Sequence, residues 1–138
     1  MRKPLMVLAA AGMTAIAFAT PAQATVNTVD MPFGMAYGNS TTSGTIHFTD
    51  GYSASVSGTV HRASGLRQVC AHGVNGNWRT EDKCSPYATA GEPDQTIRGT
   101  MTLDVPGGVQ RVYITMYDGN NVELAKEFCT RIGCTRVI

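Results

Sequence analysis

The predicted fold depends most on residues 97–117, IRGTMTLDVPGGVQRVYITMY. Apolar and polar side chains alternate on both sides of the central Pro-Gly-Gly, a pattern typical of half-buried β-strands flanking a turn. If Ile97–Val105 and Val109–Tyr117 pair as a hairpin, apolar side chains meet on one face and opposite charges meet on the other. Leu103 then lies opposite Val112. We therefore expect these two strands to be antiparallel neighbours in one sheet.

Short alternating runs also fill the rest of the chain between Gly-, Asn- and Asp-rich turns, and no 12-residue window shows an amphipathic helical stripe. The sequence predicts an all-β fold. We expect an antiparallel, disulfide-stapled β-sandwich of six to eight strands with immunoglobulin-like proportions and a C-terminal three-stranded meander. The pattern is typical of small exported bacterial β proteins, although no motif matches a particular family.

Two further turns set registers that the structure can test. A loop of Asp118-Gly119-Asn120 would place Met116 opposite Val122 on the next strand. An odd-numbered loop of Asp50-Gly51-Tyr52 would place Phe48 opposite Ala54, whereas a two-residue loop would mix the two faces.

Three other segments have simple expectations. Leu66–His72 is predicted to be a strand, and 75–93 a long loop rich in turn formers. In Met31–Gly38 the large residues alternate with Pro, Gly and Ala, so we expect an edge strand lying over the core. The alternative for that segment is an exposed Met and aromatic contact surface.

Residues 1–24 have the layout of a secretory signal peptide. Arg2 and Lys3 precede the apolar run Val7–Ala19, and Ala22-Gln23-Ala24 is a cleavage signal. We expect a single secreted domain at 25–138.

Cysteine usage agrees with export to an oxidising compartment. The four cysteines, an even number in a small chain, predict two disulfides. Spacing favours Cys70–Cys84 and Cys129–Cys134, and neither spacing is the C-x-x-C of a redox or zinc site.

The charge balance argues against nucleic acid and membrane surfaces as partners. The chain has 11 Lys and Arg against 10 Asp and Glu, and removal of the signal peptide takes away Arg2 and Lys3. The near-neutral remainder has no electrostatic footprint for nucleic acid or for a membrane surface.

Catalytic machinery is not evident in the sequence, and we expect no enzyme, no metal and no cofactor. The serines after Gly51 miss the second Gly of a G-x-S-x-G elbow, and no H-x-H or H-E-x-x-H spacing occurs. His47 and His61 are expected to face solvent. A compact hydrolase or cell-wall-active factor remains an alternative.

A six-residue ring closed by Cys129 and Cys134 would hold Arg131 in a fixed conformation. Such a ring could insert the arginine into a trypsin-like pocket, so the alternative function is a serine-protease inhibitor. The simpler interpretation is a disulfide that ties the C-terminal tail to the sheet.

A polar-aromatic face is the second binding candidate. Arg111, Tyr113, Thr115 and Tyr117 alternate with core residues and should line the outer face of their strand. A loop carrying Trp78 could lie nearby. We expect a monomeric extracellular binding protein whose partner is a protein or a glycan.

Overall fold

The computed structural model describes residues 28–49, 51–62, 64–89 and 91–138. Within them the chain forms ten strands and no helix. The strands are, in chain order, β1 (Val29–Tyr37), β2 (Ser40–Phe48), β3 (Ser53–His61), β4 (Gln68–Asn75), β5 (Trp78–Arg79), β6 (Lys83–Cys84), β7 (Gln95–Thr102), β8 (Arg111–Tyr117), β9 (Glu123–Cys129) and β10 (Cys134–Arg136). The signal peptide predicted at 1–24 lies outside the described residues.

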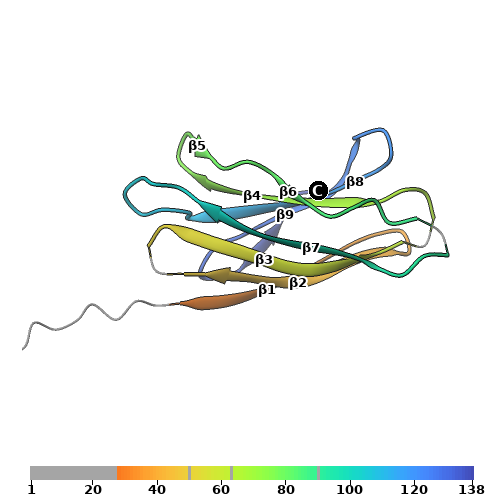
Figure 1. Cartoon of the computed structure of the whole chain (residues 1–138), viewed down its shortest axis with the longest axis horizontal. Helices are drawn as coiled ribbons and strands as arrows, with labels where there is room; N and C mark the ends of the chain where they lie inside the picture. The colour runs from red at the N-terminus through yellow and green to blue at the C-terminus, as the bar shows by residue number, and fades with distance from the viewer. Residues whose placement is uncertain (1–27, 50, 63, 90) are drawn as a thin grey trace, which may run out of the picture.

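The strands form two antiparallel sheets packed face to face (Figure 1). The four-stranded sheet has the order β1-β2-β3-β7, and the six-stranded sheet has the order β10-β9-β8-β4-β5, with β6 also paired to β4. The predicted all-β sandwich with two disulfides is confirmed. The C-terminal meander expected from the strands 97–105 and 109–117 and the strand that follows them is corrected, because β7 lies in the other sheet; the three consecutive strands that pair in order are β8, β9 and β10.

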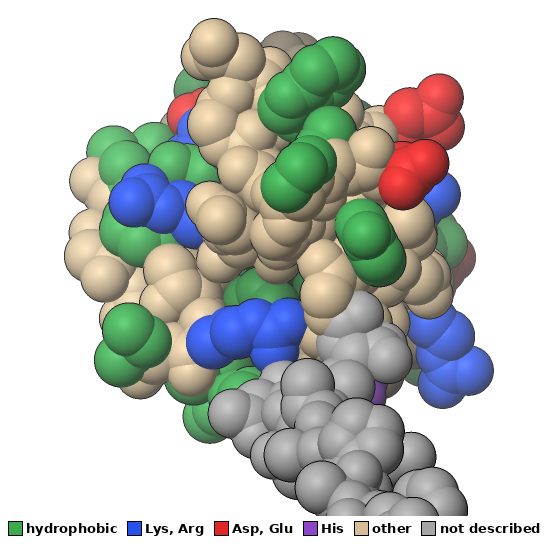
Figure 2. Space-filling view, turned by 90° about the vertical axis from the view of Figure 1, so that its left-hand side faces the viewer, with side chains coloured by type: hydrophobic (Ala, Val, Ile, Leu, Met, Phe, Trp, Pro, Cys, Tyr) green, Lys and Arg blue, Asp and Glu red, His purple; other side chains and the backbone are tan. Residues whose placement is uncertain are grey.

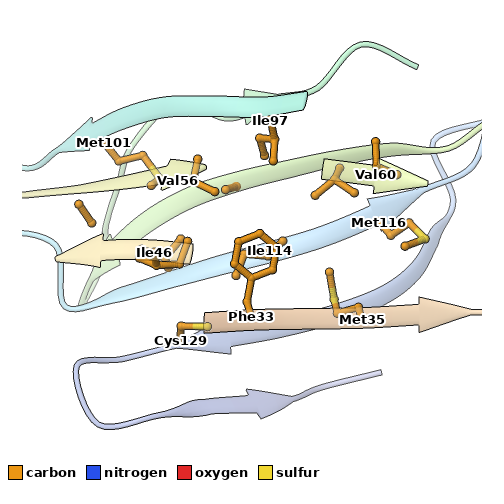
Figure 3. Close-up of a cluster of buried hydrophobic side chains, with 14 of the residues drawn as sticks. Phe33, Met35, Ile46, Val56, Val60, Ile97, Met101, Ile114, Met116 and Cys129 are labelled. Carbon is orange, nitrogen blue, oxygen red and sulfur yellow. The ribbon is translucent and has the colours of Figure 1, made fainter. Parts of the chain in front are cut away.

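The hairpin predicted within residues 97–117 is wrong. β7 pairs with β3, whereas β8 pairs with β4 and β9, so the two strands belong to opposite sheets. Their apolar side chains, among them Ile97 and Ile114, are buried between the sheets (Figure 3). Alternation reports which face of a strand is buried, and it does not report which strand lies beside it.

The segment between β7 and β8 crosses from one sheet to the other and is anchored on the β2–β3 turn. The backbone N–H groups of Leu103 and Val109 both donate to the carbonyl of Tyr52, at 3.1 and 3.3 Å. Gly108 has a φ of 55°, and a Cβ there would lie 1.9 Å from the carbonyl oxygen of Gly51. The crossing is therefore a packed connection that only glycine can make at this position.

The register predicted for the β8–β9 turn is also wrong. Met116 faces Ala125, and not Val122, with a bulge after Met116. The turn is longer because the Asp118 carboxylate accepts hydrogen bonds from the N–H groups of Asn120 and Val122, at 2.8 and 2.9 Å. As a result the opposite face of β9 turns inward.

Other local expectations hold. Phe48 lies opposite Ala54, as predicted from an odd-numbered loop. Both disulfides are present, and each joins residues directly opposite one another on paired strands. The predicted long loop at 75–93 is corrected in part, because it contains the short strands β5 and β6.

β1 is the predicted edge strand over the core. Phe33 and Met35 are buried, so the alternative of an exposed contact surface is wrong. The Phe33 ring points into the core over β2 and β3, where Gly44 and Gly58 face each other (Figure 3). Because neither glycine has a side chain, the Phe33 ring fits above them; any side chain at either position would occupy that space.

The free edge of β1 is closed by two charged residues of the other sheet. Glu127 of β9 accepts a hydrogen bond from the Gly34 N–H at 3.0 Å, and Arg136 of β10 donates to the Ala36 carbonyl at 3.1 Å. Glu127 and Arg136 are themselves cross-strand partners. Polar side chains thereby satisfy edge groups that could otherwise pair with another chain.

The first prediction concerns the seat of Phe33. In Gly44→Ala the new Cβ would lie 2.2 Å from the Ser57 carbonyl oxygen and 2.8 Å from Phe33 Cζ. We expect a loss of about 1–3 kcal/mol in the free energy of unfolding, measured by urea denaturation. Gly34→Ala is the control, because its Cβ would meet nothing closer than 3.8 Å. Equal stability of the two variants would contradict this packing.

The second prediction concerns Glu127. Burial raises the pKa of this carboxyl above its ordinary value of 4.5, and the Gly34 hydrogen bond and Arg136 oppose that shift. A pKa that is higher in the folded state means that the folded chain retains the proton longer, so this group's contribution to stability falls as pH rises from 4.5. Glu127→Gln keeps an acceptor for Gly34 and removes the charge. We expect the stability of the variant relative to wild type to increase between pH 4.5 and 7, and a constant difference would contradict this.

Candidate functional site

Three rings form one cross-strand row on the outer face of the six-stranded sheet. Tyr113 of β8 lies opposite His72 of β4 on one side and Phe128 of β9 on the other. The rings of His72 and Tyr113 stack with centroids 5.4 Å apart and 12° between their planes. The Tyr113 and Phe128 centroids are 5.6 Å apart with a tilt of 45°. We call these three residues the ring row.

Two cations lie against the ring row. The Arg111 guanidinium carbon is 5.0 Å from the Phe128 centroid, and the Lys126 ammonium nitrogen is 5.4 Å from the Tyr113 centroid. Both distances are within the range of cation–π attraction. The faces of these rings are therefore covered by neighbouring side chains of the sheet.

The Asp82 carboxylate flanks the row at His72. Its Nδ1 lies 3.3 Å from Asp82, which also accepts a hydrogen bond from Arg79 at 2.8 Å. Burial lowers the pKa of His72 below 6.5, the charge of Arg79 lowers it further, and Asp82 acts in the opposite direction. Burial thus disfavours the charged form of the His72 ring that stacks on Tyr113.

An open groove lies where β4 turns into β5, beside the start of β8. Its volume is about 280 Å³, and it is lined by Val74, Asn75, Gly76, Gln110, Arg111 and Tyr113. The β4–β5 turn and the β7–β8 crossing lie at the left-hand end of Figure 1, which faces the viewer in Figure 2. Hydrophobic side chains on that end lie in separate patches, with Lys and Arg side chains between them (Figure 2).

The predicted polar-aromatic face of β8 is present, although its members are not equivalent. Alternation places Arg111, Tyr113, Thr115 and Tyr117 on the outer side. Thr115 lies opposite Cys70 and is only 2% exposed. Tyr117 lies beyond Thr115 and does not line the groove. Of the four predicted residues, Arg111 and Tyr113 line it.

Trp78 stands at the tip of the β4–β5 hairpin. It pairs with Asn75, which lines the groove, and is 62% exposed. Its neighbour Arg79 pairs with Val74, so Arg79 and not Trp78 shares the face of the ring row. Trp78 therefore lies on the opposite face of the sheet from the ring row and is not among the residues that line the groove.

Arg131 lies in the Cys129–Cys134 ring and folds back onto the protein. Its guanidinium donates a hydrogen bond to the Thr49 carbonyl and lies 5.3 Å from the centroid of the buried Phe48 ring. The neighbouring Ile132 is 94% exposed. Insertion of Arg131 into a protease would require it to leave Thr49, so its position does not favour the inhibitor hypothesis.

Sequence reasoning missed His72 and Phe128 as members of the ring row. The predicted register, with Met116 opposite Val122, would turn Phe128 inward together with Val122, and the longer β8–β9 turn reverses that face. His72 enters the sequence analysis only as the end of the predicted strand Leu66–His72. The predicted Cys70–Cys84 disulfide could have placed Asp82 near His72, because both residues lie two positions from the paired cysteines on directly opposed segments.

The remaining candidates for catalysis or metal binding are dispersed. His61 is exposed and His47 is half-buried, and their Nδ1 atoms contact Asp94 and Asp30 respectively. Among the described residues, three possible ligand groups approach one another at Glu127, Cys129 and Cys134. Both sulfur atoms there are joined in a disulfide, so the cluster offers no thiolate to a metal.

Comparison of the chain with family models, with curated proteins and with solved structures finds no match. In the part of the chain that the structure describes, no helix is long and apolar enough to cross a membrane.

The third prediction follows from the environment of His72. An NMR titration of its imidazole should give a pKa below 6.5 in the folded protein, because burial disfavours the charged ring. Arg79→Gln removes a nearby positive charge and should raise that pKa. An unchanged or lower pKa in the variant would contradict the arrangement of Arg79, Asp82 and His72.

Proposed function

We propose that the protein is an exported, non-catalytic binding protein whose ligand site is the outer face of the six-stranded sheet around Tyr113. The groove beside Tyr113 and Arg111 carries this proposal, because it places a charged and an aromatic residue in one concave site. The site is built on paired strands, which hold side chains more rigidly than loops do.

Export is supported by the leader sequence and by the two disulfides. Cys70–Cys84 and Cys129–Cys134 use all four cysteines, and such bonds persist in oxidising compartments. Both are compatible with a secreted protein that acts outside the cell.

A hydrolytic function has less support. The His72–Asp82 pair resembles part of a catalytic triad, in which the histidine must also contact a nucleophile. Within the described residues no serine hydroxyl or thiol is hydrogen-bonded to His72. The Thr80 hydroxyl donates instead to the Glu81 carbonyl and accepts from the Gly73 N–H.

The fourth prediction tests the binding site. The oxidised protein should retain ligands on a glycan array or capture a protein partner, and Tyr113→Ala should weaken that binding about tenfold. Tyr52→Ala is the matched control, because Tyr52 is 52% exposed and lies on the β2–β3 turn. Equal binding by wild type and Tyr113→Ala, or no binding to either class, would contradict the proposal.

Trypsin inhibition is measured in parallel with wild type and Arg131→Ala. Inhibition by wild type that the substitution abolishes would support the protease-inhibitor alternative instead. We expect no inhibition, because Arg131 is held against Thr49 and Phe48.

A further inference from the structure

We propose that the groove beside Arg111 binds a saccharide unit that carries a carboxylate, as in a uronic acid. This inference rests on the proposed function and names its ligand class. Three features of the groove carry it: an arginine without an acidic partner among the described residues, a lining of amides and hydroxyl, and a volume that suits one sugar unit.

The first feature is the charge of Arg111. Two acids near Arg111 in the fold are already paired, Asp82 with Arg79 and Glu123 with Lys126. Arg111 is exposed and has no ion pair within the described residues, and its one ring contact is with Phe128. The ring holds the guanidinium in place and leaves its N–H groups for a ligand. A planar fork of donors fits a carboxylate in a bidentate manner.

The second feature is the polarity of the other lining groups. Asn75 and Gln110 bring amide side chains, Tyr113 brings a hydroxyl, and Gly76 brings backbone. The Asn75 Nδ2 already donates to the Pro106 and Gly108 carbonyls, which fixes the amide and leaves its oxygen as an acceptor. Mixed donors and acceptors of this kind match the hydroxyl groups of a sugar.

The third feature is the size of the groove. The volume of about 280 Å³ is small for a ligand pocket and suits one sugar unit.

An acidic peptide shares the carboxylate but fits less well. The only aliphatic side chain in the lining is that of Val74, so peptide side chains would find little apolar contact. The polar lining therefore favours the saccharide.

The test compares one oligosaccharide in two charge states. Calorimetric titration of the full oxidised protein uses oligogalacturonate and its methyl ester, which removes the charge and keeps the sugar. We expect the ester to bind about tenfold more weakly, and Arg111→Gln to weaken oligogalacturonate binding by a similar factor. Arg98→Gln is the control, because Arg98 is exposed on the four-stranded sheet; it should change binding by less than about twofold.

The possible results separate this inference from the proposed function. Equal affinity for the acid and the ester, with loss of both in Tyr113→Ala, would overturn charge recognition and keep a binding site at Tyr113. Binding of oligoglutamate in preference to oligogalacturonate, lost in Arg111→Gln, would overturn the saccharide and keep the site. Absence of any oligogalacturonate binding overturns the inference, while the array and capture experiments continue to test the proposed function.

Discussion

The carbonyl of Tyr52 and the glycine that passes beside it determine how the two sheets are connected. Leu103 and Val109 both donate to that one oxygen, and Gly108 passes so close to Gly51 that no side chain fits between them. The chain therefore leaves the four-stranded sheet at β7 and enters the six-stranded sheet at β8. The crossing thereby places β8 between β4 and β9, whose side chains complete the site face.

The sandwich is closed at β1 by groups that an apolar core would not contain. Glu127 occupies a core-facing position of β9, where it accepts a hydrogen bond from the Gly34 N–H on the free edge of β1. Arg136 beside it donates to the Ala36 carbonyl on the same edge. Burial of this carboxyl has a cost, as the raised pKa indicates. In return the polar pair occupies the edge of a strand that could otherwise pair with another chain.

The sequence predicted which face of a single strand is buried, and it failed to predict which strands lie side by side. Alternation placed Arg111 and Tyr113 on the outer face of β8, and it fixed the register of Phe48 with Ala54, because these are local properties. It could not reveal that residues 97–105 and 109–117 separate, since apolar residues facing across a core look the same as apolar residues facing within a sheet. Phe128 was misplaced because the Asp118 carboxylate lengthens its turn.

The Cys70–Cys84 disulfide links the stability of the fold to the geometry of the candidate site. It joins directly opposed residues of β4 and β6, and Ala71 lies opposite Lys83. The same register, continued by one residue, brings Asp82 to His72. Asp82 in turn forms an ion pair with Arg79, so the disulfide fixes the strand that carries this pair beside the ring row. Asp82 thereby contacts His72 and Arg79. Arg111 at the groove has no acidic partner within the described residues, so its guanidinium can bind a ligand.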